Sequence, residues 1–388
     1  MKKLGLLPKI LIALILGIAI GAVAPEAVVK VFATFSGLFG NLLGFVIPLI
    51  IIGFIAPGIG ELGKGAGRLL GLTAGLAYLS TIAAGLLAFF VGSSLFPHIL
   101  DVGSLAKEFA NPEEALLPPY FTVDMPPVMG VMTALLLAFT IGLGSAVIKG
   151  DTLQKVMVDL REIVEKLISS VIIPLLPIHI MSLFANLTYG GQVQMILSVF
   201  AKVFVIIIAL HLVYLLVQYL VAGQMIRKNP LGMIKNMLPA YFTAIGTQSS
   251  ASTIPVTLRQ TKKNGVSEKI ADFVVPLCAT IHLSGSTITL VCCSMAVMML
   301  HDMSTSFGMI FPFILMLGVT MVAAPGVPGG AVMAAIGLLE SMLGFGPTLT
   351  SLMIALYIAQ DSFGTACNVT GDGALAAITD RLSKSDAA

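Results

Sequence analysis

The sequence predicts an all-α integral membrane protein with eight transmembrane helices and two re-entrant helical hairpins. Composition is the first reason: of 388 residues, 57% are hydrophobic and 10% are charged, whereas soluble domains carry about 25% charged residues. The second is a series of apolar stretches long enough to cross a bilayer. The third is that two further apolar stretches are broken in the middle by glycine, serine or proline. The net charge of +2 gives no indication of nucleic-acid binding. The four cysteines lie in apolar stretches without metal-type spacing, so we expect packing residues and no disulfide framework.

The first six spans fill the N-terminal half of the chain. A spanning helix needs about 20 mainly apolar residues. Stretches of this kind lie near residues 6–24, 31–57, 69–96, 126–148, 167–188 and 195–222. If the N-terminus is cytoplasmic, all lysines and arginines except Lys30, Lys107 and Lys202 fall on the cytoplasmic side. This positive-inside pattern predicts a multi-pass protein of the cell membrane with both termini in the cytoplasm.

Interrupted apolar segments follow in the C-terminal half. Residues 230–258 are broken by a serine-rich run and have basic residues at both ends, which predicts a hairpin that enters and leaves on one side. Residues 305–340 are broken by a run of proline and glycine, with both ends on the opposite side. A span near 270–300 lies between them. This is the layout of an inverted repeat, in which interrupted segments point to a binding site at the bilayer midplane.

The last long helix, expected over residues 347–380, carries a polar face. Asp361, Thr365, Asn368 and Asp372 are spaced by four, three and four residues, which places them on one side of a helix. A carboxylate in the middle of a bilayer costs about 2.5–3.5 kcal/mol, so these side chains need partners. We therefore predict a polar ligand or ion site inside the membrane. The alternative is a pair of aspartates satisfied by hydrogen bonds between helices.

Four motifs together point to a known family. They are the serine-rich run at 247–255, the interrupted helix at 276–286, the run Gly-Val-Pro-Gly-Gly at 326–330, and Asp361 followed by Asn-Val-Thr-Gly-Asp at 368–372. In these motifs, and over nearly its whole length, the chain resembles the dicarboxylate/amino acid:cation symporter family, which includes the excitatory amino acid transporters. The resemblance implies an elevator transporter, in which a scaffold holds a mobile transport domain.

The resemblance also implies a division of the chain. Residues 1–68 (spans one and two) and 97–194 (spans four and five) would form the scaffold, which is trimeric in the family. Residues 69–96 (span three) and 195–380 (span six, both hairpins, spans seven and eight) would form the transport domain. We therefore expect a homotrimer in the lipid bilayer with a small amino acid as its substrate.

Substrate-binding positions follow from the same resemblance. Asp361 matches the aspartate that holds the substrate ammonium, and Asn368 matches the asparagine that meets the α-carboxylate. The second hairpin is the gate in the family. Free N–H groups at a broken hairpin tip suit an anion, and a buried carboxylate suits an ammonium. The expected substrate-binding residues are Ser249, Ser250, Ser286, Val327, Gly329, Asp361, Gly364, Thr365 and Asn368.

One departure from the family pattern concerns the substrate. Members that carry acidic substrates have an arginine three residues after the substrate aspartate, where this chain has Gly364. A second arginine, found at the first hairpin tip or beside the aspartate, is replaced by Gln248 or Ser362. Without a guanidinium, a side-chain carboxylate lacks its bidentate partner, so we predict a neutral amino acid. Gly364 leaves room for more than the smallest one. The alternative is a substrate carboxylate met by the hydroxyls of Ser286 and Thr365 alone.

The other departure concerns the sodium sites. Where the family usually has Asn-Met-Asp-Gly-Thr, this chain has His-Leu-Ser-Gly-Ser at 282–286. An asparagine and an aspartate of the family's sodium sites are thus replaced by His282 and Ser284. Asn368 and Asp372 are the candidates for a residual sodium ion. The expected cation or proton site consists of Tyr78, Thr81, His282, Ser284, Asn368 and Asp372.

His282 offers a replacement for the lost sodium ion. By family geometry it would lie near Asp372, where an imidazolium could supply a positive charge. Transport would be proton-coupled if the histidine titrates during the cycle, and uncoupled if its charge stays fixed. Two alternatives are a neutral histidine bonded to the backbone, and a sodium-coupled amino acid or dicarboxylate symporter with fewer sodium sites. The other histidines are assigned no role.

Two other classes of protein fit the sequence less well. A membrane enzyme would need a nucleophile and a base, and His282 with Ser284 or Ser286 is the only candidate pair. A passive channel would need a polar stripe through several spans, whereas spans one, two and six are expected to carry almost none. We therefore predict a secondary active transporter and no enzymatic activity. We expect no cofactor other than a coupling ion, sodium or a proton.

Overall fold

The computed structural model describes five ranges of the chain. These are residues 6–63, 68–100, 116–322, 324 and 328–385. Within these ranges all regular structure is helical and no strand occurs. The all-α class predicted from the sequence is therefore confirmed.

Five helical stretches are long and apolar enough to cross a membrane. They are Glu26–Gly60, Leu69–Ile99, Thr152–Tyr189, Ile196–Ile226 and Glu268–Leu300. Shorter apolar helices accompany them, for example Pro8–Val23 and Leu136–Val147. The multi-pass character is thus confirmed, whereas the number of eight spans stays a prediction.

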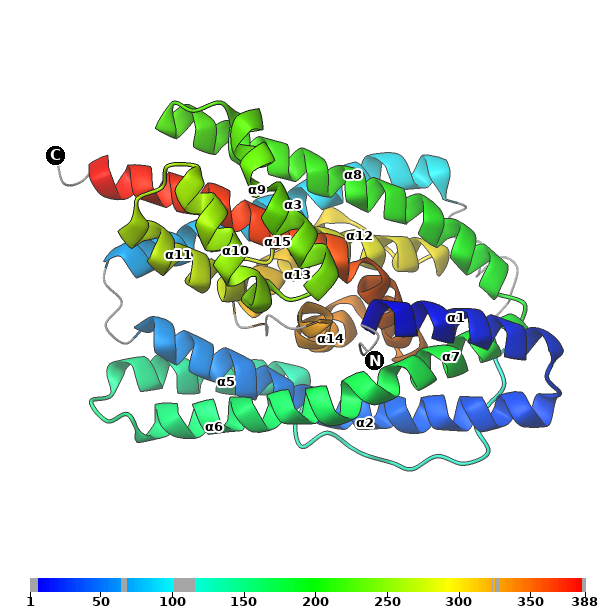
Figure 1. Cartoon of the computed structure of the whole chain (residues 1–388). Helices are drawn as coiled ribbons and strands as arrows, with labels where there is room; N and C mark the ends of the chain where they lie inside the picture. Colours follow the sequence, from blue (N-terminus) through cyan, green and yellow to red (C-terminus); the bar gives the residue numbers. More distant parts are fainter. Residues whose placement is uncertain (1–5, 64–67, 101–115, 323, 325–327, 386–388) are drawn as a thin grey trace, which may run out of the picture.

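One set of helices, which we call the N-terminal group, lies along one side of the molecule (Figure 1). It consists of α1 (Leu6–Val23), α2 (Glu26–Gly63), α5 (Val131–Val147), α6 (Thr152–Leu167), the short π-helical turn η1 (Ile168–Ile172) and α7 (Ile173–Tyr189). α2 packs against α5, α6 and α7, and α1 packs against α7. A Cβ atom on Gly17 or Gly21 would lie 2.4 Å or 2.2 Å from the carbonyl oxygens of Met181 or Ala185. These glycines therefore allow the close approach of α1 and α7 that small residues commonly provide in membranes.

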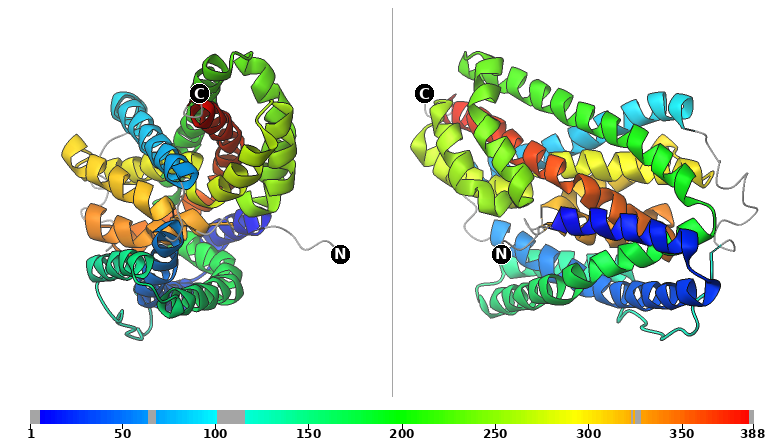
Figure 2. Two further views of the ribbon diagram at one scale, coloured as in Figure 1. Left: turned by 90° about the vertical axis from the view of Figure 1, so that its left-hand side faces the viewer. Right: turned by 45° about the vertical axis from the view of Figure 1, so that its right-hand side comes forward.

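The remaining helices, which we call the site group, surround the last one. They are α3 (Arg68–Ile99), α8 (Val193–Ile226), α9 (Pro230–Thr247), α10 (Ser250–Lys263), α11 (Glu268–Ile281), α12 (Ser284–Leu300), α13 (Phe307–Met321), α14 (Gly330–Leu343) and α15 (Pro347–Ser385). α15 packs against α8 to α12, and Figure 2 shows it in red among them. Because polar side chains are spread along it, α15 is not one of the five apolar spans.

Both interrupted apolar segments fold as pairs of packed helices. In the first, α9 and α10 are joined by Gln248 and Ser249 alone. Gln248 takes the left-handed conformation (φ 53°), and Ser249 caps α10 by accepting a hydrogen bond from the N–H of Ser252 (3.3 Å). In the second, α13 and α14 pack together, and the predicted tip residue Val327 lies outside the described residues. Gly329 begins α14 with φ 73°, a conformation that favours glycine.

The interrupted helix is broken at two residues only, His282 and Leu283, which separate α11 from α12. The sequence predicted a longer interruption within residues 276–286, and this was too wide. The N–H of His282 still bonds to the carbonyl of Cys278 (2.9 Å), and the N–H of Thr287 bonds back to the carbonyl of Leu283 (2.9 Å). Both half-helices are thus hydrogen-bonded up to the break. The break brings the carboxyl end of one helix and the amino end of the next to one place, as in discontinuous transporter helices.

Candidate substrate and ion site

Asp361 lies at the amino end of α14. Its Oδ2 atom accepts a hydrogen bond from the backbone N–H of Gly329 at 2.7 Å, and the residue is 4% exposed. The hydroxyl of Thr365, one turn further along α15, lies 3.5 Å from its Oδ1 atom. Helix amino ends carry partial positive charge, so α14 stabilises the carboxylate. The aspartate that the sequence singled out thus faces the hairpin expected to be the gate.

Asn368 joins α15 to the first turn of α12. Its Oδ1 atom accepts hydrogen bonds from the N–H groups of Gly285 (2.8 Å) and Ser286 (3.3 Å). Its Nδ2 atom donates to Oγ of Ser286 (3.0 Å), which also accepts from the hydroxyl of Tyr357 (2.8 Å). A neutral amide therefore occupies the amino end of α12. Two of the predicted substrate-binding residues, Asn368 and Ser286, are in direct contact.

Glycines let α12 and α15 approach each other closely at this point. A Cβ atom on Gly285 would lie 2.5 Å from the carbonyl oxygen of Gly364 and 2.6 Å from Cβ of Cys367, so no side chain fits there. A Cβ atom on Gly364 would lie 3.5 Å from the backbone nitrogen of Ser286, which is an ordinary van der Waals contact. Gly364 stands where acidic-substrate members of the resembled family carry an arginine, and it therefore faces the first turn of α12.

The tip of the first hairpin reaches the same region of α15. Nε2 of Gln248 donates to Oγ of Ser362 at 2.9 Å, and both side chains are buried. Gln248 and Ser362 stand at the two positions where members of the resembled family carry the second arginine, and they are therefore neighbours in space. Ser249 and Ser250 are buried directly after Gln248, at the amino end of α10.

His282 and Asp372 form a buried pair. Nδ1 of His282 lies 2.9 Å from Oδ1 of Asp372, and each residue is 0% exposed. On the other side of the ring, Nε2 lies 3.0 Å from Oγ of Ser80. Within the part of the chain that the structure describes, Oδ2 of Asp372 and Oγ of Ser284 have no hydrogen-bond partner. The contact expected between His282 and Asp372 is therefore present.

α8 contributes a polar face that the sequence reading missed. Oγ of Ser80 lies 2.9 Å from the hydroxyl of Tyr214 and accepts from Nε2 of Gln218 at 3.0 Å. His211, also on α8, places Nε2 2.9 Å from the carbonyl oxygen of Gly285. The expectation that span six carries almost no polar residues was therefore wrong. The signal was present in the sequence, because positions 211, 214 and 218 are three and four residues apart and share one side of a helix.

Tyr78 and Thr81, the two predicted positions on α3, make other contacts. Tyr78 donates its hydroxyl to the carbonyl of Leu315 (3.4 Å), and Thr81 donates to the carbonyl of Ala77 in its own helix (2.9 Å). Their neighbour Ser80 is the α3 residue that reaches His282. Among the described residues, no three of His, Cys, Asp or Glu are grouped as metal ligands.

Comparison with known proteins decides the family. The sequence profile of the Sodium:dicarboxylate symporter family matches residues 6–382. The chain belongs to this family. A serine/threonine transporter SstT from Acinetobacter baumannii (strain AYE) is 28% identical over 403 residues, which cover 99% of this chain and 98% of the relative. A protein of the same name from Streptococcus suis (strain 05ZYH33) is 28% identical over 341 residues, which cover 86% of this chain and 94% of the relative.

Membership of the sodium:dicarboxylate symporter family fixes the class of activity. The protein is a transporter of a small molecule and not an enzyme. It is a multi-pass membrane protein, in agreement with its long apolar helices. The family name implies coupling to a cation.

Proposed function

We propose that this symporter-family member carries neutral amino acids of the size of serine and threonine. The relatives named above are serine/threonine transporters. The observation that carries the proposal is the set of groups around Asp361. The N–H of Gly329 and the hydroxyls of Thr365 and Tyr357 approach this carboxylate, and no guanidinium is among its described contacts. A substrate with one ammonium and one carboxylate fits such a site, whereas a second carboxylate would be buried without a cation.

The substrate ammonium takes the place of the Gly329 N–H at Asp361. At present this N–H holds the amino end of α14 against α15 (2.7 Å). An ammonium is a charged donor and bonds a carboxylate more strongly than a neutral N–H does. Binding therefore releases the tip of the second hairpin from Asp361. The second hairpin, as the gate, therefore responds directly to binding of the substrate ammonium at Asp361.

The substrate carboxylate lies between the first hairpin and Asn368. The amino end of α10 at Ser249 and Ser250 provides partial positive charge. The Nδ2 group of Asn368 now donates to Ser286 (3.0 Å) and turns to the carboxylate when substrate is present. Neutral donors from α10 and α15 thus hold the carboxylate of an amino acid without an arginine.

A proton on the His282–Asp372 pair serves as the coupling cation. The hydroxyl of Tyr214 donates to the carbonyl of Ser80 (2.5 Å), which leaves the tyrosine oxygen able to accept. If His282 is an imidazolium, it donates to Asp372 and to Oγ of Ser80, and Ser80 donates to Tyr214. If the ring is neutral, the Ser80 hydroxyl turns and donates to Nε2 instead. One hydroxyl rotation lets the site hold or release a proton.

A sodium ion at Asp372 is the second candidate for coupling. Oδ2 of Asp372 and Oγ of Ser284 are buried, and within the described residues they have no hydrogen-bond partner. Hard cations take oxygen ligands of this kind. The ring of His282 occupies the other carboxylate oxygen (2.9 Å), which leaves fewer ligands than the family pattern provides. Dependence of uptake on sodium separates the two candidates.

Transport proceeds by movement of the site group against the N-terminal group. This division follows the one expected from the sequence, with the N-terminal group as a scaffold that trimerises. Between α2 and α14 lies a cavity of about 410 Å³, lined by residues of both groups that include Gly44 and Glu340. We infer that this cavity leaves the two groups room to shift against each other.

Counterflow in proteoliposomes tests the substrate class. Liposomes loaded with unlabelled serine should accumulate labelled serine and threonine saturably, and labelled glutamate at least about tenfold less, since burial of an unpaired charge costs well over 1.4 kcal/mol. Asp361→Asn keeps the shape of the side chain and should abolish serine counterflow. Asp302→Asn, at an exposed position after α12, is the matched control and should not. Glutamate accumulation equal to that of serine would contradict the proposal.

A further inference from the structure

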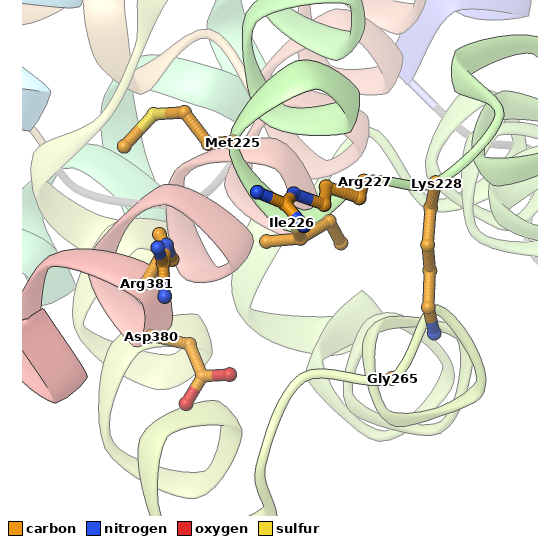
Figure 3. Close-up of a pocket in the computed structure, with 7 residues that line it drawn as sticks. All are labelled: Met225, Ile226, Arg227, Lys228, Gly265, Asp380 and Arg381. Carbon is orange, nitrogen blue, oxygen red and sulfur yellow. The ribbon is translucent and has the colours of Figure 1, made fainter.

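A basic cavity lies where α8 and α15 end and the turn before α11 passes between them. Its volume is about 390 Å³. Its lining, drawn in Figure 3, consists of Met225, Ile226, Arg227, Lys228, Gly265, Asp380 and Arg381. Three of these seven residues are cations and one is an acid. None of them belongs to the site around Asp361 and His282.

Two guanidinium groups in this cavity have no partner in the protein. Within the described residues, the guanidinium groups of Arg227 and Arg381 make no hydrogen bond and no ion pair, although the backbone N–H of Arg227 bonds to the carbonyl of Gly223. Lys228 donates to the carbonyl of Asn264 (2.8 Å), which fixes one wall of the cavity. Figure 3 shows the side chain of Arg227 running across the cavity toward the side on which Arg381 lies. The one carboxylate of the lining, Asp380, accepts a hydrogen bond from Ser267, so the two guanidinium groups border the cavity as donors without a protein acceptor in the described part of the chain.

The backbone at Arg227 is a second, independent indication of a role for this side chain. Arg227 ends α8 in the left-handed conformation, with φ 55°. Glycine or asparagine adopts this conformation more readily than arginine. A strained residue of this kind at a functional position is a common finding. Since the turn itself does not favour an arginine, we attribute the presence of Arg227 at this position to a role of its guanidinium group.

We propose that this cavity binds a phosphate ester that carries a net negative charge. Guanidinium donors match the geometry of phosphate oxygens, and Lys228 adds a further positive charge. The volume of about 390 Å³ lies in the range of small-molecule sites, about 300–1,000 Å³, so a phosphate ester fits better than a lone ion. The charge pattern of the chain predicts that this end faces the cytoplasm. There both anionic phospholipid headgroups and soluble phosphate esters supply the group.

Thermal unfolding of the purified full-length protein tests this proposal. The protein in a neutral detergent is titrated with short-chain phosphatidylglycerol, with phosphatidylcholine of the same chains, and with glycerol 3-phosphate. A ligand that binds only the folded state raises the unfolding temperature saturably. We expect this rise with phosphatidylglycerol or glycerol 3-phosphate and not with phosphatidylcholine. A response to glycerol 3-phosphate identifies a soluble ester as the source, and a response to phosphatidylglycerol alone identifies a lipid headgroup.

Two double variants separate a built site from general surface charge. Arg227→Gln/Arg381→Gln should raise the half-saturating concentration at least about tenfold, because both charged donors are lost. Lys235→Gln/Lys269→Gln removes the same charge from exposed positions outside the cavity and should leave the half-saturating concentration unchanged. Arg381→Gln alone should show a smaller loss, and it serves if the double variant does not fold. An equal rise of the half-saturating concentration in both double variants would overturn the proposal. So would a wild-type response to phosphatidylcholine as large as the response to phosphatidylglycerol.

Discussion

At the residue scale, the proposed substrate choice depends on the groups that surround Asp361. Gln248 and Ser362 bond to each other (2.9 Å) where a guanidinium would stand in an acidic-substrate transporter. Gly364 faces the first turn of α12. A buried ion that lacks a partner is strongly destabilised, so in the proposed function the absence of these arginines excludes substrates with a second carboxylate.

Gly364→Arg should therefore add acidic substrates to those the protein accepts. A Cβ atom at this position meets only ordinary contacts, the nearest at 3.5 Å, so a side chain can begin there. We expect glutamate counterflow relative to serine to rise at least about tenfold, as one new charged pair allows. Gly364→Gln has a long neutral side chain and should leave the ratio unchanged. A folded arginine variant with the wild-type ratio would show that the neutral surroundings do not set selectivity.

His282→Asn should remove the pH dependence of uptake. His282 contacts Asp372 on one side (2.9 Å) and Ser80 on the other (3.0 Å), and its imidazole can hold the proton that the proposed coupling requires. We expect serine counterflow of the wild type to change with pH and that of the variant to be lower and independent of pH. His179→Asn is the matched control, because His179 is equally buried but lies on α7. A wild-type pH profile in His282→Asn would exclude this histidine from coupling.

At the element scale, the contact between α12 and α15 requires a glycine at one position and merely accepts one at another. Gly285→Ala would push a Cβ atom to 2.5 Å from the carbonyl oxygen of Gly364. Overpacking of this kind costs about 1–3 kcal/mol, and it would also move the N–H groups bonded to Asn368. We expect a lower unfolding temperature. We also expect at least a tenfold loss of serine counterflow, and a factor of ten corresponds to about 1.4 kcal/mol.

Gly364→Ala is the control for this substitution. Its Cβ atom would lie at 3.5 Å from the nearest neighbour and should be tolerated. Both measurements use the same purified protein, so stability and transport can be compared directly. Equal behaviour of the two alanine variants would show that the close approach at Gly285 does not matter.

The helices that carry the site could be placed from the sequence, but their facing sides could not. The runs of glycine, serine and proline located both hairpins and the helix break. The polar spacing on α15 identified Asp361 and Asp372. The sequence favoured Tyr78 and Thr81 on α3, whereas Ser80 is the residue that meets His282. α3 is apolar on its exposed and its buried sides alike, so its sequence gives no periodicity from which to read its rotation, and that rotation decides which polar residue faces a neighbour.

At the scale of the whole molecule, the proposed mechanism moves the site group past the N-terminal group. Gly44 on α2 and Glu340 on α14 line one cavity between them. A cysteine pair at Gly44 and Glu340, joined by a short bifunctional maleimide, should stop serine counterflow. The native cysteines in the described residues are all buried, so the reagent should act on the introduced pair.

Cysteines at Gly40 and Gly44 are the matched control for this cross-link. Both positions lie on α2, and a Cβ atom at either meets nothing within 4 Å. Joining them ties the N-terminal group to itself and should leave counterflow intact. Full counterflow after complete cross-linking of the Gly44 and Glu340 positions would rule out sliding at this boundary.

The dependence of uptake on sodium decides whether the His282–Asp372 pair replaces the sodium ion. Liposomes loaded with neutral amino acids are diluted into buffer that contains either sodium or choline, and labelled serine is followed at two pH values. If the His282–Asp372 pair replaces the sodium ion, uptake in choline should equal uptake in sodium, with a difference between the two pH values if a proton is carried. Uptake that vanishes in choline would contradict the account. It would mean that Asp372 and Asn368 still hold sodium without the family's missing aspartate.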